Sequence, residues 1–118
     1  MIKYHTKNKI LIAELLPESR ISNTEDILDV MAEAGYNQAT FVIIYSESLP
    51  DGFFDLKTRI AGEILQKFSN YRMKLAIIGD FSNIESKSLR DFIRESNRTG
   101  IISFVGSLEE AFSKSTVY

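Results

Sequence analysis

One continuous stretch of the sequence, Phe53–Asp80, joins a helix pattern directly to a strand pattern. Its apolar residues first recur at helical spacing, which predicts an amphipathic helix over Leu56–Tyr71. The run Lys74–Gly79 that follows is almost entirely apolar, as is typical of a strand buried on both faces of a sheet. A helix that leads straight into a doubly buried strand indicates an α/β domain.

Further strand patterns flank this stretch. Thr40–Tyr45 and Ile101–Val105 are rich in apolar and β-branched residues, and they predict two more buried strands. Near the start, Ile2–Tyr4 and Lys9–Leu16 flank the polar segment His5–Asn8, a pattern that predicts a hairpin turn. Because the second of these strands is too apolar for an edge that faces water, we expect it inside the sheet.

Polar residues mark the expected helix ends. Ser22 and Glu25 form a capping-box pattern, and Gly35 lies where that helix would end in the left-handed conformation. Asp55 is placed to cap the Leu56–Tyr71 helix. The last two helices have their own candidate caps, which are Ser86 or Ser88 for one and the box Ser107–Glu110 for the other.

Two glycines have specific expected roles. In the turn predicted at Leu49–Gly52, Pro50 presets φ and Gly52 tolerates a positive φ. Gly62 lies in the middle of a predicted helix, where glycine costs about 1 kcal/mol relative to alanine. We expect a neighbouring element to approach the helix backbone closely at that point.

The resulting order is β-β-α-β-α-β-α-β-α, in a chain of 118 residues that fits a single domain over residues 1–118. Alternating strands and helices predict right-handed crossovers and a mixed, mainly parallel sheet of about five strands covered by helices. The residues expected in its core are Leu11, Ala13, Val42, Ile44, Leu75, Ile77, Ile102 and Phe104, or their immediate neighbours in each strand.

Composition restricts the classes of function. The net charge of −2 is spread along the chain without a basic block, so nucleic acid is not an expected partner. The sequence has no cysteine, which excludes disulfides and thiolate chemistry. Its apolar runs are far shorter than the ~20 residues of a membrane span, and its first residues lack the apolar core of a signal peptide. We therefore expect a cytoplasmic protein with no membrane partner.

The segment Gly52–Ala111 resembles a known family. Its wording, FFDLKT..AGEILQKFSNYR.KLAI.GDFS followed by SKSLRDFI.ESN, resembles a small bacterial family, the domain of unknown function numbered four-one-eight-zero. The element order, with its opening hairpin and a helix after the second buried strand, is similar to the STAS fold of anti-sigma-factor antagonists and sulfate-transporter tails. These resemblances imply a single STAS-like domain and no established activity.

The STAS resemblance can be followed residue by residue. Anti-sigma-factor antagonists carry an aspartate, a phosphorylatable serine, a second hydroxyl residue and a glycine at the start of the corresponding helix. Asp55 matches the aspartate, whereas Leu56 and Lys57 stand where the hydroxyl residues would be. The serine acceptor is absent. Thr58, near the glycine position, is the best-placed remaining acceptor for a phosphorylation switch.

Carboxylates follow two of the predicted strands. Glu47, Asp51 and Asp55 come after one buried strand, and Asp80 comes after the next. Ligands of open α/β sheets bind beyond the carboxyl ends of the parallel strands, so these side chains would share one rim. There they could bind Mg²⁺ or act as an acid–base pair. The alternative is that they are a helix cap, a turn residue and solvated loop charges.

The same rim carries other candidate features. Lys57 and Thr58 lie beside the amides of a predicted helix start, which can bind an anion, although the Asp55 carboxylate would compete for those amides.

His5, the only histidine, lies in the predicted hairpin, where we interpret it as a surface residue and not as part of a catalytic or metal site.

Aromatic residues flank the buried strands near this rim. They could line an apolar pocket or a partner surface, or belong to the core. Neighbours in an extended segment point to opposite sides, so we expect at least one of Phe53 and Phe54 to be buried, and the other is the better contact residue. The aromatic residues concerned are Tyr45, Phe53, Phe54, Tyr71 and Phe81.

We therefore predict a non-enzymatic regulatory or binding domain without a cofactor, whose unknown protein or small-molecule partner contacts Glu47–Lys57 and Asp80–Ser86. A small metal-dependent enzyme that uses the acidic rim is the alternative, and a small-molecule carrier is a further one. Self-association as a homodimer stays open. The expected binding residues are Glu47, Phe54, Asp55, Lys57, Thr58, Asp80 and Phe81.

Overall fold

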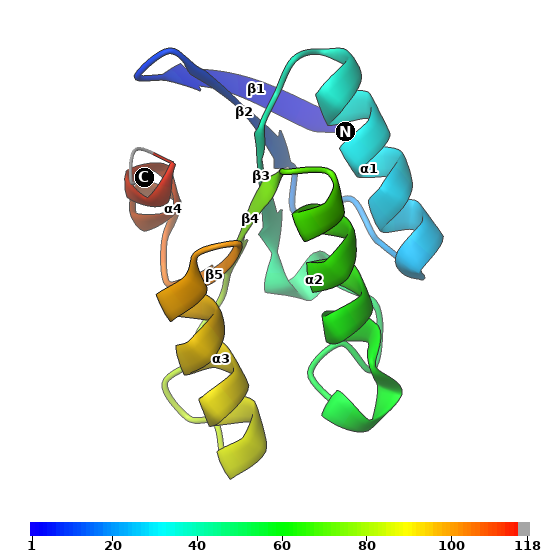
Figure 1. Ribbon diagram of the computed structural model, residues 1–118, viewed down its shortest axis with the longest axis vertical. Coiled ribbons are helices and arrows are strands. Elements are labelled where there is room, and N and C mark those ends of the chain that lie inside the picture. The colour runs from blue at the N-terminus through cyan, green and yellow to red at the C-terminus, as the bar shows by residue number, and fades with distance from the viewer. Residues whose placement is uncertain (116–118) are drawn as a thin grey trace.

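The alternating strand and helix patterns form one mixed sheet with helices on both faces in the computed structural model, which describes residues 1–115 (Figure 1). This confirms the predicted α/β class and element order. The elements are β1 (Ile2–Lys7), β2 (Ile10–Leu15), α1 (Thr24–Tyr36), β3 (Phe41–Tyr45), the 3-10 turns η1 (Ser46–Ser48) and η2 (Leu56–Thr58), α2 (Ile60–Asn70), β4 (Lys74–Ile78), α3 (Lys87–Thr99), β5 (Ile102–Val105) and α4 (Leu108–Lys114).

The sheet has the strand order β1-β2-β3-β4-β5. β1 pairs with β2 as an antiparallel hairpin, and every later pairing is parallel. Ala13, Val42, Leu75 and Ile102 lie side by side across the parallel strands. β2 therefore lies inside the sheet, as its apolar sequence predicts, and the polar β1 forms the edge.

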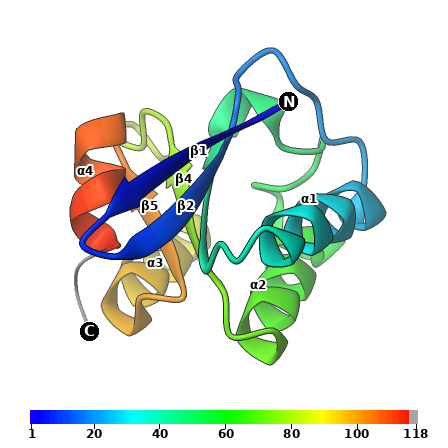
Figure 2. The same cartoon turned by 90° about the horizontal axis from the view of Figure 1, so that it is seen from above.

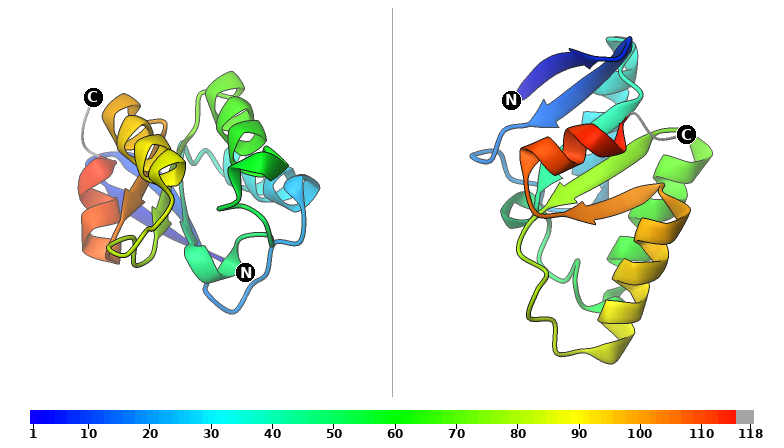
Figure 3. Two further views of the ribbon diagram at one scale, coloured as in Figure 1. Left: turned by 90° about the horizontal axis from the view of Figure 1, so that it is seen from below. Right: turned by 90° about the vertical axis from the view of Figure 1, so that its left-hand side faces the viewer.

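The two faces of the sheet are covered unequally. Helices α1, α2 and α3 pack on one face, and the short α4 crosses the other (Figures 2 and 3). The first face carries the larger core, with Phe53 and Phe68 among its largest fully buried side chains. Among the helices of residues 1–115, none is long and apolar enough to cross a membrane.

The predicted core is buried except at one position. Leu11 is only half-buried, whereas its neighbour Ile12 is fully buried on the opposite face. Leu11 lies near the start of β2, before the residues that pair with β3, where its carbonyl oxygen accepts from the Thr40 amide at 3.2 Å. The other seven predicted residues, Ala13, Val42, Ile44, Leu75, Ile77, Ile102 and Phe104, are at most 6% exposed.

The turn of the hairpin is shorter than the sequence predicts. β1 continues to Lys7, and the turn consists of Asn8 and Lys9, which both have a positive φ (50° and 68°). A two-residue turn with two positive φ values matches the right-handed twist of the paired strands, so pairing continues up to it. His5 consequently lies within a strand and pairs with Ile12, and its assignment to a surface turn was wrong.

The first helix begins one residue later than predicted, and its left-handed end lies three residues later. Asn23, not Ser22, is its N-cap and accepts a hydrogen bond from the Asp26 amide at 2.9 Å. At the other end Gly35 is still helical, and the positive φ occurs at Gln38 (74°). Asparagine caps at least as well as serine, which accounts for the shift. The predicted caps Ser86 and Ser107 are both confirmed.

The predicted Leu56–Tyr71 helix is two elements. Asp55 caps only the 3-10 turn η2, by accepting from the Lys57 amide at 3.1 Å. Arg59 then adopts a left-handed conformation (φ 65°), and α2 starts at Ile60. The apolar periodicity continues through the break, which is why the sequence pattern does not reveal it. The turn prediction is confirmed, since Gly52 has φ 85°.

The expected close approach at Gly62 is absent. A Cβ atom built there would meet nothing within 4 Å among the described residues outside its own helix. The glycine faces outward in a shallow groove between α2 and Phe92 of α3. Its presence is therefore not explained by packing within the chain.

Ile44 tests the doubly buried strand assignment, because it is fully buried in β3. Replacing it with alanine should lower the free energy of unfolding by about 2–5 kcal/mol, whereas Ile44→Val should cost only about 0.5–1.5 kcal/mol. Urea unfolding followed by circular dichroism measures both. An alanine variant that unfolds at the wild-type midpoint would show that the site tolerates a cavity and is not core.

Candidate functional site

The loops that follow β2, β3 and β4 emerge at the same edge of the sheet, and a hollow of about 480 Å³ opens among the first two. The hollow lies at the edge where the sequence places the rim. It is lined by Arg20, Ser46, Glu47, Leu49, Pro50, Asp51, Gly52, Phe53, Phe54 and Asp55.

The loop between η1 and α2 is held in place from within. Phe53 is 1% exposed and anchors the loop in the core. The Thr58 hydroxyl donates to the Gly52 and Asp55 carbonyl oxygens at 2.7 and 2.8 Å. These contacts join the two ends of the segment 52–58, and they hold the backbone that carries the Asp55 carboxylate beside the hollow.

Arg20 completes the hollow from the β2–α1 connection. Its guanidinium donates to the Glu47 carbonyl oxygen, and the Ile21 amide donates to the Ser48 carbonyl oxygen at 2.8 Å. Arg20 is not among the predicted site residues, because the prediction covered only the loops after the two most apolar strands. The prediction that β2 lies inside the sheet was the available signal, since the end of an inner parallel strand shares the rim.

The loop after β4 lies against the loop after β3. A Cβ atom at Gly79 would come within 2.6 Å of the Ser46 Oγ, so only glycine allows this approach. Asp80 accepts from the Ser82 hydroxyl at 2.6 Å and from its amide at 3.1 Å. These hydrogen bonds, the side-chain one first, hold the pKa of the exposed Asp80 carboxyl below its usual range.

An aromatic contact joins the two loops. The Phe54 ring lies 5.9 Å from the Phe81 ring, and both pack against Phe104 of β5. Phe53 is buried and Phe54 is half-buried, as predicted, but the segment is a turn and not an extended strand, and the two rings pack edge-on with their centres 4.8 Å apart. The aromatic residues thus form the apolar base of the rim, where Phe54 and Phe81 are both half-buried.

The structure brings together part of the predicted site. Glu47, Phe54 and Asp55 line the hollow. Phe81 does not line it but packs against Phe54. Lys57, Thr58 and Asp80 are exposed nearby but do not line it. Within residues 1–115, the acidic and histidine side chains form no group of three or more that could hold a metal ion.

The amides considered for an anion are already bonded. The Lys57 amide donates to the Asp55 carboxylate, and the Ile60 amide donates to the Thr58 Oγ1 at 3.3 Å. The helix that was to supply the site starts only at Ile60, after the left-handed Arg59. The rim therefore presents carboxylates and one guanidinium, not a free helix start.

A second polar cluster lies on the α4 face of the sheet. Glu14 in β2 is 5% exposed and bonds the His5 Nε2 at 2.8 Å, and it accepts from the Tyr45 hydroxyl at 2.7 Å. These three residues come from β1, β2 and β3. The sequence signal for the cluster was a glutamate inside an otherwise apolar strand, since a buried carboxylate requires hydrogen-bond donors.

The cluster changes the titration of Tyr45. Burial, the hydrogen bond to Glu14 and the negative charges of Glu14 and Glu47 raise the pKa of Tyr45 to about 12. On the same face, Phe112 of α4 packs edge-on against His5, and the Lys7 ammonium lies 4.8 Å from the centre of the Phe112 ring. The cluster therefore joins the edge hairpin, the sheet and α4.

The chain belongs to the family described as a domain of unknown function (DUF4180), whose model matches residues 6–114. The match confirms the family resemblance that the sequence of Gly52–Ala111 indicated. It also extends the resemblance toward the N-terminus, into the hairpin. Neither a search of curated proteins nor a search of solved structures gives a match.

Tyr45 tests the Glu14 cluster. An unfolded tyrosine ionises near pH 10.0, whereas folded Tyr45 keeps its proton to about pH 12. The resulting stability is complete below pH 10.0 and is lost as the pH rises to about 12, because the unfolded chain releases the proton first. Urea unfolding over this range should show a smaller alkaline loss in Tyr45→Phe than in the wild type.

Tyr71→Phe is the matched control, because Tyr71 is 66% exposed. Its alkaline loss of stability should equal that of the wild type. An equal loss in wild type and Tyr45→Phe would mean that Glu14 does not hold the Tyr45 proton.

Proposed function

We propose that this protein is a regulatory binding domain that receives its partner at the rim of the sheet. The observation that carries the proposal is the hollow of about 480 Å³ bounded by the β2–α1 and β3–α2 connections. Such an edge is where open α/β sheets bind their ligands, because the helices cover the faces but not the strand ends. The surface continues over the half-buried Phe81, whose ring lies beside that of Phe54, to the β4–α3 connection.

The charges of the hollow indicate the chemistry of the partner. Glu47, Asp51 and Asp55 contribute three carboxylates, and Arg20 contributes one guanidinium that already bonds a carbonyl oxygen. The lining is therefore formally −2 and suits a cationic group, either an ammonium or a guanidinium. We propose that a basic side chain of a partner protein, or a small organic cation, enters here.

The element order and the opening hairpin support a STAS-like regulatory role in a bacterial cytoplasm. In this proposal the rim itself transmits the signal, and Thr58 phosphorylation is not required. The Thr58 hydroxyl donates to two carbonyl oxygens, and a phosphate there would remove these donor bonds and lie close to the Asp55 carboxylate.

Asp55 separates a binding role from a capping role. Asp55→Ser keeps a capping oxygen but removes the charge, so it should bind arginine amide several-fold more weakly than the wild type at nearly unchanged stability. Asp55→Ala should show the same loss of binding together with about 1 kcal/mol of lost stability. Amide chemical shifts during an arginine amide titration measure binding and should change mainly in residues 46–58 and 80–86.

Glu109→Gln is the control for net charge, because Glu109 is exposed on α4. It should bind the probe as the wild type does. Shifts confined to the hairpin turn or α4, or equal affinity in Asp55→Ser, would contradict the proposal. A parallel thermal-shift titration with Mg²⁺, Mn²⁺ and Ca²⁺ tests the metal alternative, and stabilisation by these ions that Asp55→Ser removes would favour it.

A further inference from the structure

The outer side of α1 carries an unbalanced row of carboxylates. The helix has four acidic residues and no basic residue. Glu25, Asp29 and Glu33 are exposed at i, i+4 and i+8, and within residues 1–115 no hydrogen bond or ion pair reaches their carboxylates. Like charges at this spacing destabilise a helix, and Glu33 also lies at its carboxyl-terminal end, where negative charge is unfavourable.

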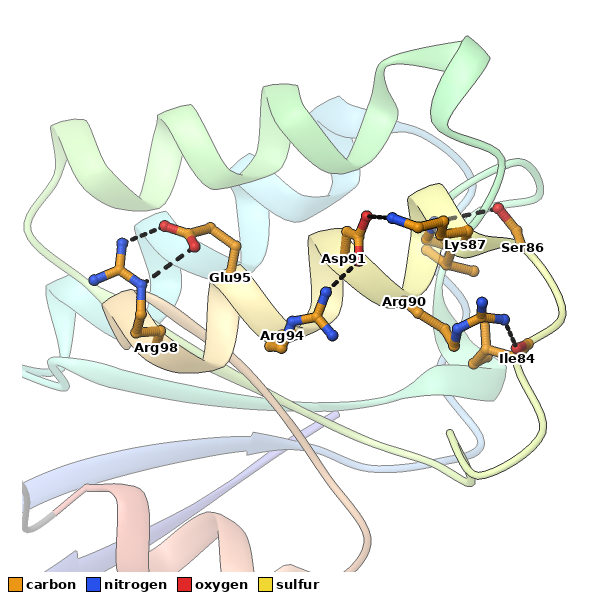
Figure 4. Close-up of polar contacts among 9 residues, drawn as sticks. Ile84, Ser86, Lys87, Arg90, Asp91, Arg94, Glu95 and Arg98 are labelled. Carbon is orange, nitrogen blue, oxygen red and sulfur yellow. Dashed lines mark hydrogen bonds and ion pairs between the residues drawn. The ribbon is translucent and has the colours of Figure 1, made fainter.

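The outer side of α3 carries the complementary row. The helix has four basic and two acidic residues, while the rest of the chain has ten basic and fourteen acidic residues. Arg90, Arg94 and Arg98 follow one another at i, i+4 and i+8 along the helix (Figure 4). Arg90 donates to the Ile84 and Glu85 carbonyl oxygens at 2.8 Å.

The other two arginines are bonded within their own helix. Arg94 pairs with Asp91, and Arg98 pairs with Glu95. Each guanidinium has five N–H donors, so these contacts leave donors on every arginine of the row for a further carboxylate.

The spacing of the two rows is the same. Residues four apart in a helix lie about 6 Å apart along its axis, so three carboxylates of one helix can face three guanidinium groups of another in register. We propose that α1 of one copy docks along α3 of a second copy of this chain. The inference does not rest on the proposed cation site at the hollow, although the docked surface includes Phe81 and the loop before α3, which also border the rim.

An antiparallel arrangement of the two helices gives the better fit. It pairs Glu33 with Arg90 and places Tyr36, one turn further on, near the loop that precedes α3. Tyr36 is 85% exposed, and a hollow of about 300 Å³ with Phe81, Ile84 and Ile93 in its lining lies beside Arg90 and Arg94. The ring of Tyr36 would cover this apolar floor next to the two arginines, where aromatic rings pack well.

The positions of the helices determine the kind of assembly. α1 and α3 lie on opposite sides of α2 (Figure 2). Each copy therefore presents its acidic row on α1 and its basic row on α3 in different directions. Such a head-to-tail contact produces open chains or a closed ring. Exposed ion pairs are individually weak, so the assembly should be weak, concentration-dependent and suppressed by salt.

Sedimentation velocity with charge-reversed variants tests this pairing. One variant carries Glu25→Lys, Asp29→Lys and Glu33→Lys, and the other carries Arg94→Glu and Arg98→Glu. Arg90 is left unchanged because it supports the preceding loop. The average mass of the wild type should rise with concentration at low ionic strength and fall to the monomer in high salt. Each variant alone should stay monomeric, and their equimolar mixture should associate again.

Because the two reversed variants carry formal net charges of +4 and −6, the association of their mixture counts for the proposal only together with the loss of association in each variant alone and in the neutral set described below. A monomeric wild type at low ionic strength, or a mixture that stays monomeric, would overturn the proposal. If circular dichroism shows that a reversed variant is unfolded, the neutral set Glu25→Gln, Asp29→Asn and Glu33→Gln replaces it and must lose the association of the wild type. The rim variant Asp55→Ser should associate as the wild type does.

Discussion

The rest of the structure depends on the parallel pairing of β3 with β4, two strands that are buried on both faces. Their residues pair from Phe41 with Lys74 to Tyr45 with Ile78. Parallel neighbours cannot be joined by a short turn, so each connection must cross a face as a helix. The loops that follow these strands then emerge at one edge. The position of the rim is therefore a consequence of strand pairing, and the loops determine which side chains line it.

The same sheet contains an ionisable side chain whose burial must be compensated. A buried carboxylate without partners is costly, and Glu14 avoids this cost through His5 and Tyr45. These partners come from the two strands beside β2, so the bonds form only when the hairpin and the parallel strands are both in register. The cluster thus links the antiparallel and parallel parts of the sheet. With Phe112 packed against His5, it also fixes where α4 can lie.

The sequence predicts what depends on local patterns and misses what depends on distant pairing. Strands such as Phe41–Tyr45 were predicted because a short, continuous apolar run is typical of a buried strand. Asp55 and Phe54 were assigned to the rim because they follow such a strand in the predicted topology. The break at Arg59 was missed because a left-handed residue leaves no trace in the apolar period. Arg20 and the His5–Glu14 contact were missed because each needs two segments brought together by the sheet.

The polar surfaces of the molecule fall into two regions. The rim is formed at the strand ends and is formally negative, whereas the rows on α1 and α3 lie on the outer sides of helices that flank α2. The hollow shares no residue with either row, whereas Phe81 and the loop before α3 border both regions. Gly62 lies between the two helix rows, in a groove lined by residues of η2 and α2 and by Phe92 of α3. Because α2 begins only at Ile60, Gly62 stands in its first turn and not in its middle, so the cost of about 1 kcal/mol that a glycine brings to a helix interior does not apply in full there.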